Sequence, residues 1–193
     1  MNPLSQYLLA NAFNNLWANH RLLAACAQLS QAEFAASRVS FFPSIKATLN
    51  HNLTVDWFYV DALERERRGE PPHDDCYEFF KLGEPFALCA ELMREQQRVD
   101  LRLVAYCEQL RDADCDRQVT IARPGNAQRD TRARLLAHLF QHQIHHRGQA
   151  HAMLAGTSVK PPQLDEFFCA GEAHLRADDL ATLGLAEARV WSR

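Results

Sequence analysis

Histidines are concentrated in one short stretch of this chain. Five of the 9 histidines lie within fourteen residues, at His138, His142, His145, His146 and His151. An α-helix turns 100° per residue, so His138, His142 and His146, which are spaced four apart, share one face of a helix. Neutral imidazole is the side chain most often found on divalent transition metals. The spacing therefore predicts that this helix supplies part of a metal site.

One helix cannot supply the whole site. Residues four apart lie about 6 Å apart along the axis, whereas His138 and His146 are separated by about 12 Å. A single ion can therefore be held by His138 with His142, or by His142 with His146. His145 points about 100° away from His146 and is a poor partner for it. At least one further ligand has to come from another part of the chain.

His51 is the favoured additional ligand, because it lies in the middle of an apolar helical segment. His20, in the first helix, is the alternative. His73 lies in a proline-rich connection and His174 in the tail, and both are less suited to an interior site. A metal-free bundle, in which the histidines only form hydrogen bonds in the core, remains a third interpretation at this stage.

Composition narrows the classes of protein. The 193 residues are 47% hydrophobic and 23% charged, with a net charge of −3, and we expect one domain over residues 1–193. No basic excess favours nucleic-acid binding, and no apolar run is long enough to span a membrane. The first residues do not form a signal peptide. The 6 cysteines include no C-x-x-C pair, so a reducing, cytoplasmic setting is expected.

Apolar periodicity predicts an all-α fold. Long helices are expected near residues 3–29, 43–68, 85–110 and 130–155, with Pro43 in the first turn of the second helix and Asp130 capping the fourth. The long connection over residues 69–84 fits a crossover between helices that run the same way. A small hairpin is expected within residues 118–126. The bundle would then occupy residues 1–156, with a tail over 157–193 containing short helices near 164–168 and 178–189.

Several enzyme classes are excluded because the sequence lacks their motifs. The sequence has no H-E-x-x-H motif, which supplies the general base of zinc proteases. Its one E-x-x-H string, Glu70 to His73, contains two prolines and cannot form the helical pair of a carboxylate-bridged di-iron bundle. No serine nucleophile elbow and no phosphate-binding loop occur.

Three segments resemble the DinB/YfiT-like superfamily. The string H-Q-I-H-H-R-G-Q over residues 142–149 is similar to the family's H-x-x-x-H-R-G-Q signature. Residues 13–19 and 48–56 resemble its motifs in the first and second helices. The resemblance covers residues 1–155 and implies a four-helix bundle in up-down-down-up order. It also implies one divalent metal ion on His51, His142 and His146, with zinc or nickel favoured over manganese or iron, and a homodimer.

The resemblance also suggests a chemistry. Three protein ligands leave a coordination position open, as in catalytic sites, and an ion with an open position can activate a thiol. We therefore expect a metal-dependent S-transferase that joins a low-molecular-weight, glutathione-like thiol to a small electrophile, or a related thiol-dependent enzyme. A non-catalytic, stress-related metal-binding bundle is the alternative.

Three further residues are expected behind the ligands. His138 would lie one turn from His142, and we favour a core position for it. Arg147 is expected to pair with an acidic residue of another helix, and Gln149 to lie near the site. Gly148 is expected to allow a neighbouring helix to approach closely.

Overall fold

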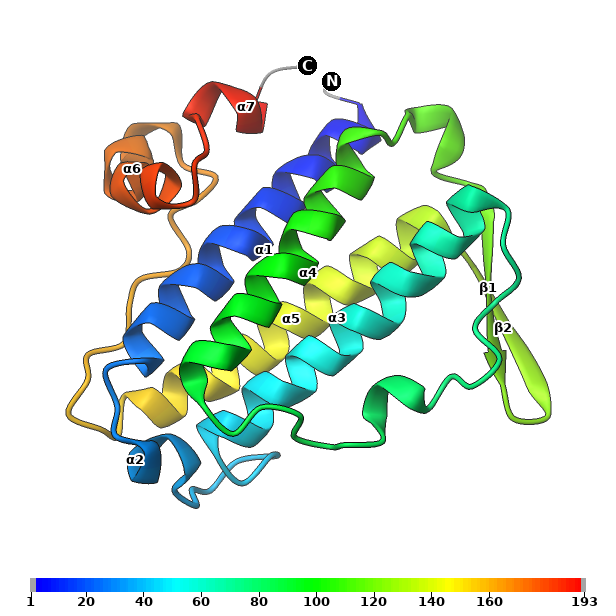
Figure 1. The fold of residues 1–193 in the computed structure, drawn as a ribbon. Helices are drawn as coiled ribbons and strands as arrows, with labels where there is room; N and C mark the ends of the chain where they lie inside the picture. Colours follow the sequence, from blue (N-terminus) through cyan, green and yellow to red (C-terminus); the bar gives the residue numbers. More distant parts are fainter. Residues whose placement is uncertain (1–2, 192–193) are drawn as a thin grey trace.

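The computed structural model, which describes residues 3–191, is mostly helical (Figure 1). Four long helices lie side by side: α1 (Leu4–Cys26), α3 (Ile45–Arg68), α4 (Cys89–Glu108) and α5 (Arg132–Leu154). Helices α1 and α3 each contact both α4 and α5, so the core lies between all four. No helix in residues 3–191 is long and apolar enough to cross a membrane.

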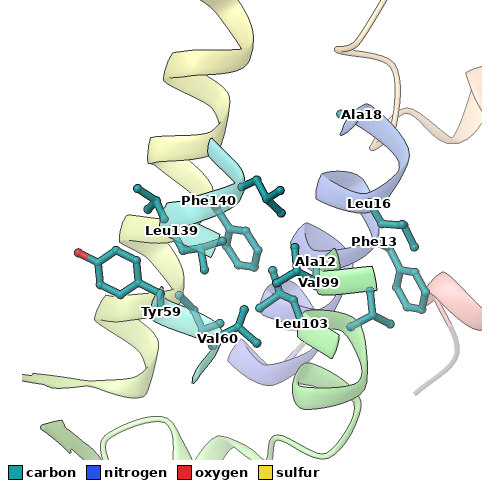
Figure 2. Packing of buried hydrophobic residues seen from close by; sticks show 14 of the residues in the cluster. Ala12, Phe13, Leu16, Ala18, Tyr59, Val60, Val99, Leu103, Leu139 and Phe140 are labelled. Atoms are coloured by element: carbon teal, nitrogen blue, oxygen red, sulfur yellow. The ribbon is translucent and has the colours of Figure 1, made fainter. Parts of the chain in front are cut away.

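The core is made of the apolar faces that the periodicity indicated. Figure 2 shows Phe13 and Leu16 of α1 near Val99 and Leu103 of α4. Leu139 of α5, which is fully buried, lies beside Phe140 on the other side of the view. Four of the six free cysteines are also buried: Cys26, Cys76, Cys107 and Cys115. These thiols pack as small apolar side chains.

Local signals set the ends of α3. The side chain of Ser44 accepts a hydrogen bond from the backbone N–H of Ala47, at 3.0 Å, so Ser44 is the N-cap. Pro43 therefore precedes the helix, and its predicted place in the first turn is wrong. The helix ends, as predicted, before Gly69, whose φ of 71° is in the left-handed region that glycine tolerates.

Helix α4 begins four residues later than predicted, at Cys89. The cause is a tertiary contact, because the Asn50 side chain accepts from the Phe86 N–H and donates to the Phe86 carbonyl, both at 2.9 Å. This clamp holds residue 86 outside the helix. The connection after α3 therefore runs over residues 69–88 and contains a single 3-10 turn, η1 (Glu78–Phe80).

The predicted hairpin forms between α4 and α5. It follows the short turn η2 (Asp112–Asp114) and pairs β1 (Gln118–Arg123) with β2 (Asn126–Thr131) in antiparallel register. Asp130 pairs with Val119 in the hairpin, and the hydroxyl of Thr131 caps α5 by accepting from the Arg134 N–H at 3.2 Å. The predicted cap at Asp130 is therefore displaced by one residue.

The tail runs back along α1 and ends in two short helices (Figure 1). The helix expected at 164–168 does not form; Phe167 instead packs on Trp17 with ring centroids 5.5 Å apart. The second expected helix is divided by Gly184, at a φ of 68°, into α6 (Ala173–Thr182) and α7 (Glu187–Trp191). The remaining elements are α2 (Gln31–Ala35) and η3 (Ala170–Glu172).

Candidate metal centre

Three histidines from two helices converge on one point. His51 lies on α3, and His142 and His146 lie on α5; one ligand nitrogen from each is within 4.8 Å of the others. The Nε2 atoms of His51 and His142 are 3.0 Å apart. Two nitrogens bound to one ion at about 2.1 Å lie roughly 3.0–3.5 Å apart. The three side chains therefore fit a single divalent ion, and of the two pairs open from the spacing, His142 with His146 is the one brought to His51.

Burial keeps these imidazoles neutral. Burial, with a smaller contribution from the nearby His146, lowers the pKa of His51 to about 4. Burial also lowers the pKa of His142 to about 3, with smaller contributions from the neighbouring histidines. The pKa of His146 is lowered by burial too, although its hydrogen bond to Gln149 acts in the opposite direction. Neutral imidazole is the form that carries a free lone pair, so the cluster is ready to coordinate at neutral pH.

Gln149 determines which nitrogen of His146 is free. His146 Nδ1 lies 2.8 Å from Gln149 Oε1 and donates its proton to that oxygen, which leaves the lone pair on Nε2. The amide nitrogen of Gln149 is 3.1 Å from His145 Nε2. By contrast, His142 Nδ1 is buried and has no hydrogen-bond partner within residues 3–191. Gln149 therefore contacts His146 on the side of the ring opposite Nε2.

His138 is not part of the core. Its side chain is exposed, with its ring centroid 6.2 Å from that of His142 and 5.2 Å from that of Tyr59. The core position that we favoured for His138 is wrong, because the 100° step per residue turns this end of the histidine stripe outward. His20 belongs to another region, beside Asn19 and Asp100.

Aromatic residues cover one side of the cluster. The ring of Phe42 lies 4.4 Å from that of His51 and 5.4 Å from that of His146. Phe42 also lines a cavity of about 290 Å³, together with His51, Ala47, Phe80 and Glu84. This cavity was not predicted from the sequence, because Phe80 and Glu84 reach it from the long connection after α3.

Arg147, the next residue after His146, points into a separate buried network. Its Nη1 donates to Oδ1 of Asn15 and to Oδ1 of Asn19, the latter at 3.0 Å. The amide nitrogens of Asn15 and Asn19 in turn donate to Asp100, at 2.9 and 3.1 Å. No ion pair joins Arg147 to a carboxylate within residues 3–191, so the predicted acidic partner is replaced by two amides that connect it to Asp100.

A second carboxyl group completes the network. Gln96 of α4 donates to Asp56 of α3 at 2.6 Å and to Asp100 at 3.1 Å. Burial raises the pKa of Asp100 to about 6. Burial and the nearby Asp100 hold the pKa of Asp56 well above its ordinary range. The network connects all four long helices and was not recognised from the sequence, although its asparagines lie in the first-helix motif.

The expectation that Gly148 allows a neighbouring helix to approach closely is wrong. A Cβ atom at this position would meet no neighbouring atom within 4 Å. No other helix approaches closely there, and Gly148 instead lines an open cavity on the far side of α5.

One known family matches most of the chain. The DinB family model matches residues 5–175. The chain belongs to the DinB family. The match begins in α1 and continues into α6, which is further than the motifs themselves reach. A comparison with curated proteins gives no match, so the family and the three-histidine group are the basis for a functional assignment.

Proposed function

We propose that this DinB-family protein binds one divalent metal ion through His51, His142 and His146, and transfers a low-molecular-weight thiol to a small electrophile at that ion. The observation that carries the proposal is the double role of His51. Its imidazole belongs to the metal-binding cluster and also lines the cavity beside it. An ion held there would be next to space for a substrate, as a catalytic site requires and a closed structural site does not.

When bound, the ion would lower the pKa of a thiol at its open position. The chain's own residues hold the ion and orient its ligands. The neutral imidazoles offer lone pairs without first losing protons. Gln149 orients His146, and Phe42 covers the His51 and His146 rings and excludes water from that side.

The transfer itself needs no base from the protein. The thiol loses its proton to solvent, its sulfur forms a bond to the electrophilic carbon, and the leaving group departs with the electron pair of the broken bond. Phe42, Ala47 and Phe80 offer apolar surface for the body of the electrophile. The one carboxylate in the wall, Glu84, is paired with Lys46 at 3.0 Å.

The proposal also covers the metal, the thiol, the order of the helices and the oligomeric state. Three imidazoles suit zinc or nickel best, with manganese and iron as alternatives, and glutathione is the model thiol. The long connection between α3 and α4 supports the up-down-down-up order. Exposed Leu4 and Tyr7 on α1 support a homodimer. We further infer a single domain over residues 1–193, in the cytoplasm.

A cavity-filling substitution tests catalysis separately from metal binding. Ala47 is buried in the cavity wall and is not a ligand, so Ala47→Phe should fill the cavity and leave the three histidines in place. We expect full metal content by elemental analysis, and loss of most glutathione conjugation to a small aryl chloride. Ala105→Phe, the same exchange at an exposed position of α4, is the matched control and should retain both.

The same measurements distinguish the thiol transferase from the non-catalytic metal-binding bundle. Stoichiometric metal in the wild-type protein without conjugation of any thiol would favour the non-catalytic metal-binding bundle. Undiminished conjugation by Ala47→Phe would show that the reaction does not use this cavity.

A further inference from the structure

A second and larger cavity lies on the other side of α5. It measures about 620 Å³ and is enclosed by α1, α5 and the start of the tail. Its wall includes Tyr7 and Asn14 from α1, Ile144 and Gly148 from α5, and Phe167 from the tail. This volume is within the range of small-molecule binding sites.

The cavity is separate from the histidine cluster. Its α5 residues are Arg147 and a stripe of four residues that follow helical spacing, Gln141, Ile144, Gly148 and His151. At 100° per residue, that stripe faces roughly away from His142 and His146. A ligand in this cavity would therefore have the body of α5 between itself and the metal centre.

Arg147 presents unused hydrogen-bond donors at the cavity wall. Its side chain is only 4% exposed, and all of its hydrogen bonds are made by Nη1. Its Nε and Nη2 donate to no acceptor within residues 3–191. These two groups form the edge of a guanidinium that binds a carboxylate with two parallel hydrogen bonds. A buried arginine normally has an acidic partner, and the described protein offers Arg147 none in direct contact.

Asn14 contributes an amide group to the same wall. Its Oδ1 is shielded from solvent, whereas its Nδ2 donates to no acceptor within residues 3–191. A free amide donor favours a ligand that carries a carbonyl oxygen. Ile144, Leu164 and Phe167 supply apolar surface beside these polar groups.

We propose that this cavity binds a small carboxylate that also carries an amide carbonyl and an apolar side chain, as an N-acylated amino acid does. The carboxylate would lie against Arg147, the amide carbonyl would accept a hydrogen bond from Asn14 Nδ2, and the side chain would contact the apolar wall. The proposal does not depend on the thiol chemistry of the histidine site.

Three probes test which chemical groups are recognised. Calorimetric titration of the full chain with N-acetyl-L-phenylalanine should show saturable binding. N-acetyl-L-phenylalaninamide removes the carboxylate charge, and 3-phenylpropanoate removes the amide; each should bind at least about tenfold more weakly. The charge is removed from the probe and not from Arg147, because Arg147 also holds α1 through Asn15 and Asn19.

A glycine substitution tests the location. A leucine side chain at Gly148 would extend into open space within the cavity. Gly148→Leu should keep the helical circular dichroism of the wild type and weaken probe binding at least about tenfold. Gly171→Leu is the matched control, since a Cβ there also meets nothing within 4 Å and Gly171 lies outside the cavity. It should bind the probe like the wild type.

Three outcomes would overturn the proposal. One is the absence of saturable binding at millimolar probe, and another is equal affinity for the acid and its amide. The third concerns assembly: if sedimentation shows a wild-type dimer that Gly148→Leu dissociates, a second copy of the chain covers this cavity.

Discussion

His146 and Arg147 are neighbours in the chain but belong to regions of opposite character. His146 joins His51 and His142 in a cluster at the α3–α5 contact, beside an open cavity. Arg147 joins a network of amide and carboxyl side chains enclosed by all four long helices. The helical step of 100° per residue is enough to separate them.

The two regions use their hydrogen-bonding groups differently. In the network, Asn15, Asn19 and Gln96 bind Arg147 or the buried carboxyl groups directly. In the histidine cluster, one nitrogen from each of three imidazoles lies within 4.8 Å of the others, and no other protein group lies between them in the hydrogen bonds of residues 3–191. Connected polar networks stabilise a unique packing, whereas imidazole nitrogens that converge on one point are suited to a metal ion. One motif thus supplies both residues of the candidate metal centre and a member of the network that connects the four long helices.

The largest expected effect is loss of the metal when a ligand is removed. His142→Ala should abolish stoichiometric zinc or nickel binding, because His142 is central to the cluster. His138→Ala should retain the metal, because His138 is exposed and lies outside the group. Elemental analysis of both purified variants makes the comparison. Equal loss of metal in the two variants would contradict the assignment of ligands.

Arg147→Ala should cause the largest loss of stability. It leaves Asn15, Asn19 and the buried carboxyl groups without their cation, and removing one member of a buried ionic network costs about 3–5 kcal/mol. His146→Ala should lower the free energy of unfolding of the metal-free protein by only about 1 kcal/mol, the ordinary cost of a substitution. Urea denaturation in the presence of a chelator measures both. A similar cost for the two variants would remove the distinction between binding site and structural network.

Gln149→Ala should weaken metal binding without removing a ligand. Loss of the group that orients a metal-binding histidine typically costs about 10–100-fold in affinity. Gln149→Glu keeps an acceptor for His146 Nδ1 and should restore much of the affinity. Competition titration with a chromogenic chelator provides the measurement, with Gln141→Ala, an exposed exchange on the same helix, as the control. If Gln149→Ala binds as tightly as the wild type, the hydrogen bond to His146 has no role in coordination.

A smaller effect is expected from the charge state of the buried carboxyl groups. The pKa of Asp56 is raised in the folded protein, so the folded state retains a proton that the unfolded state loses as pH rises above about 4. The free energy of unfolding contributed by Asp56 is therefore highest in acid and falls as pH increases. Asp56→Asn, which resembles the protonated carboxyl, should match the wild type near pH 4 and be more stable than the wild type at pH 8.

The comparison with Asp56→Asn is made on metal-free protein, so that titration of the histidines cancels between the two proteins. A stability difference that is constant from pH 4 to pH 8 would show that Asp56 titrates normally.

The four long helices were predictable because each carries an apolar stripe over many turns. The ends of the helices were less predictable. The hydrogen bond between Asn50 and Phe86 moves the start of α4 to a later residue, and Asp130 pairs in the hairpin, so Thr131 is the N-cap of α5. Residues 164–168 were expected to be helical but pack through Phe167 onto Trp17 instead. In each case a contact between distant residues overrode the local preference.

The sequence by itself determined the class of the fold, the family, and the i, i+4 histidine pairs of α5, because these depend on local periodicity and on a continuous motif. Only the tertiary structure decided that His51 meets His142 and His146, that His138 faces solvent, and that Arg147 binds amides. The physical reason is that spacing within a helix defines directions, whereas the groups met in those directions belong to other helices. The two cavities depend on the tertiary structure for the same reason, since each is enclosed by segments distant in the chain.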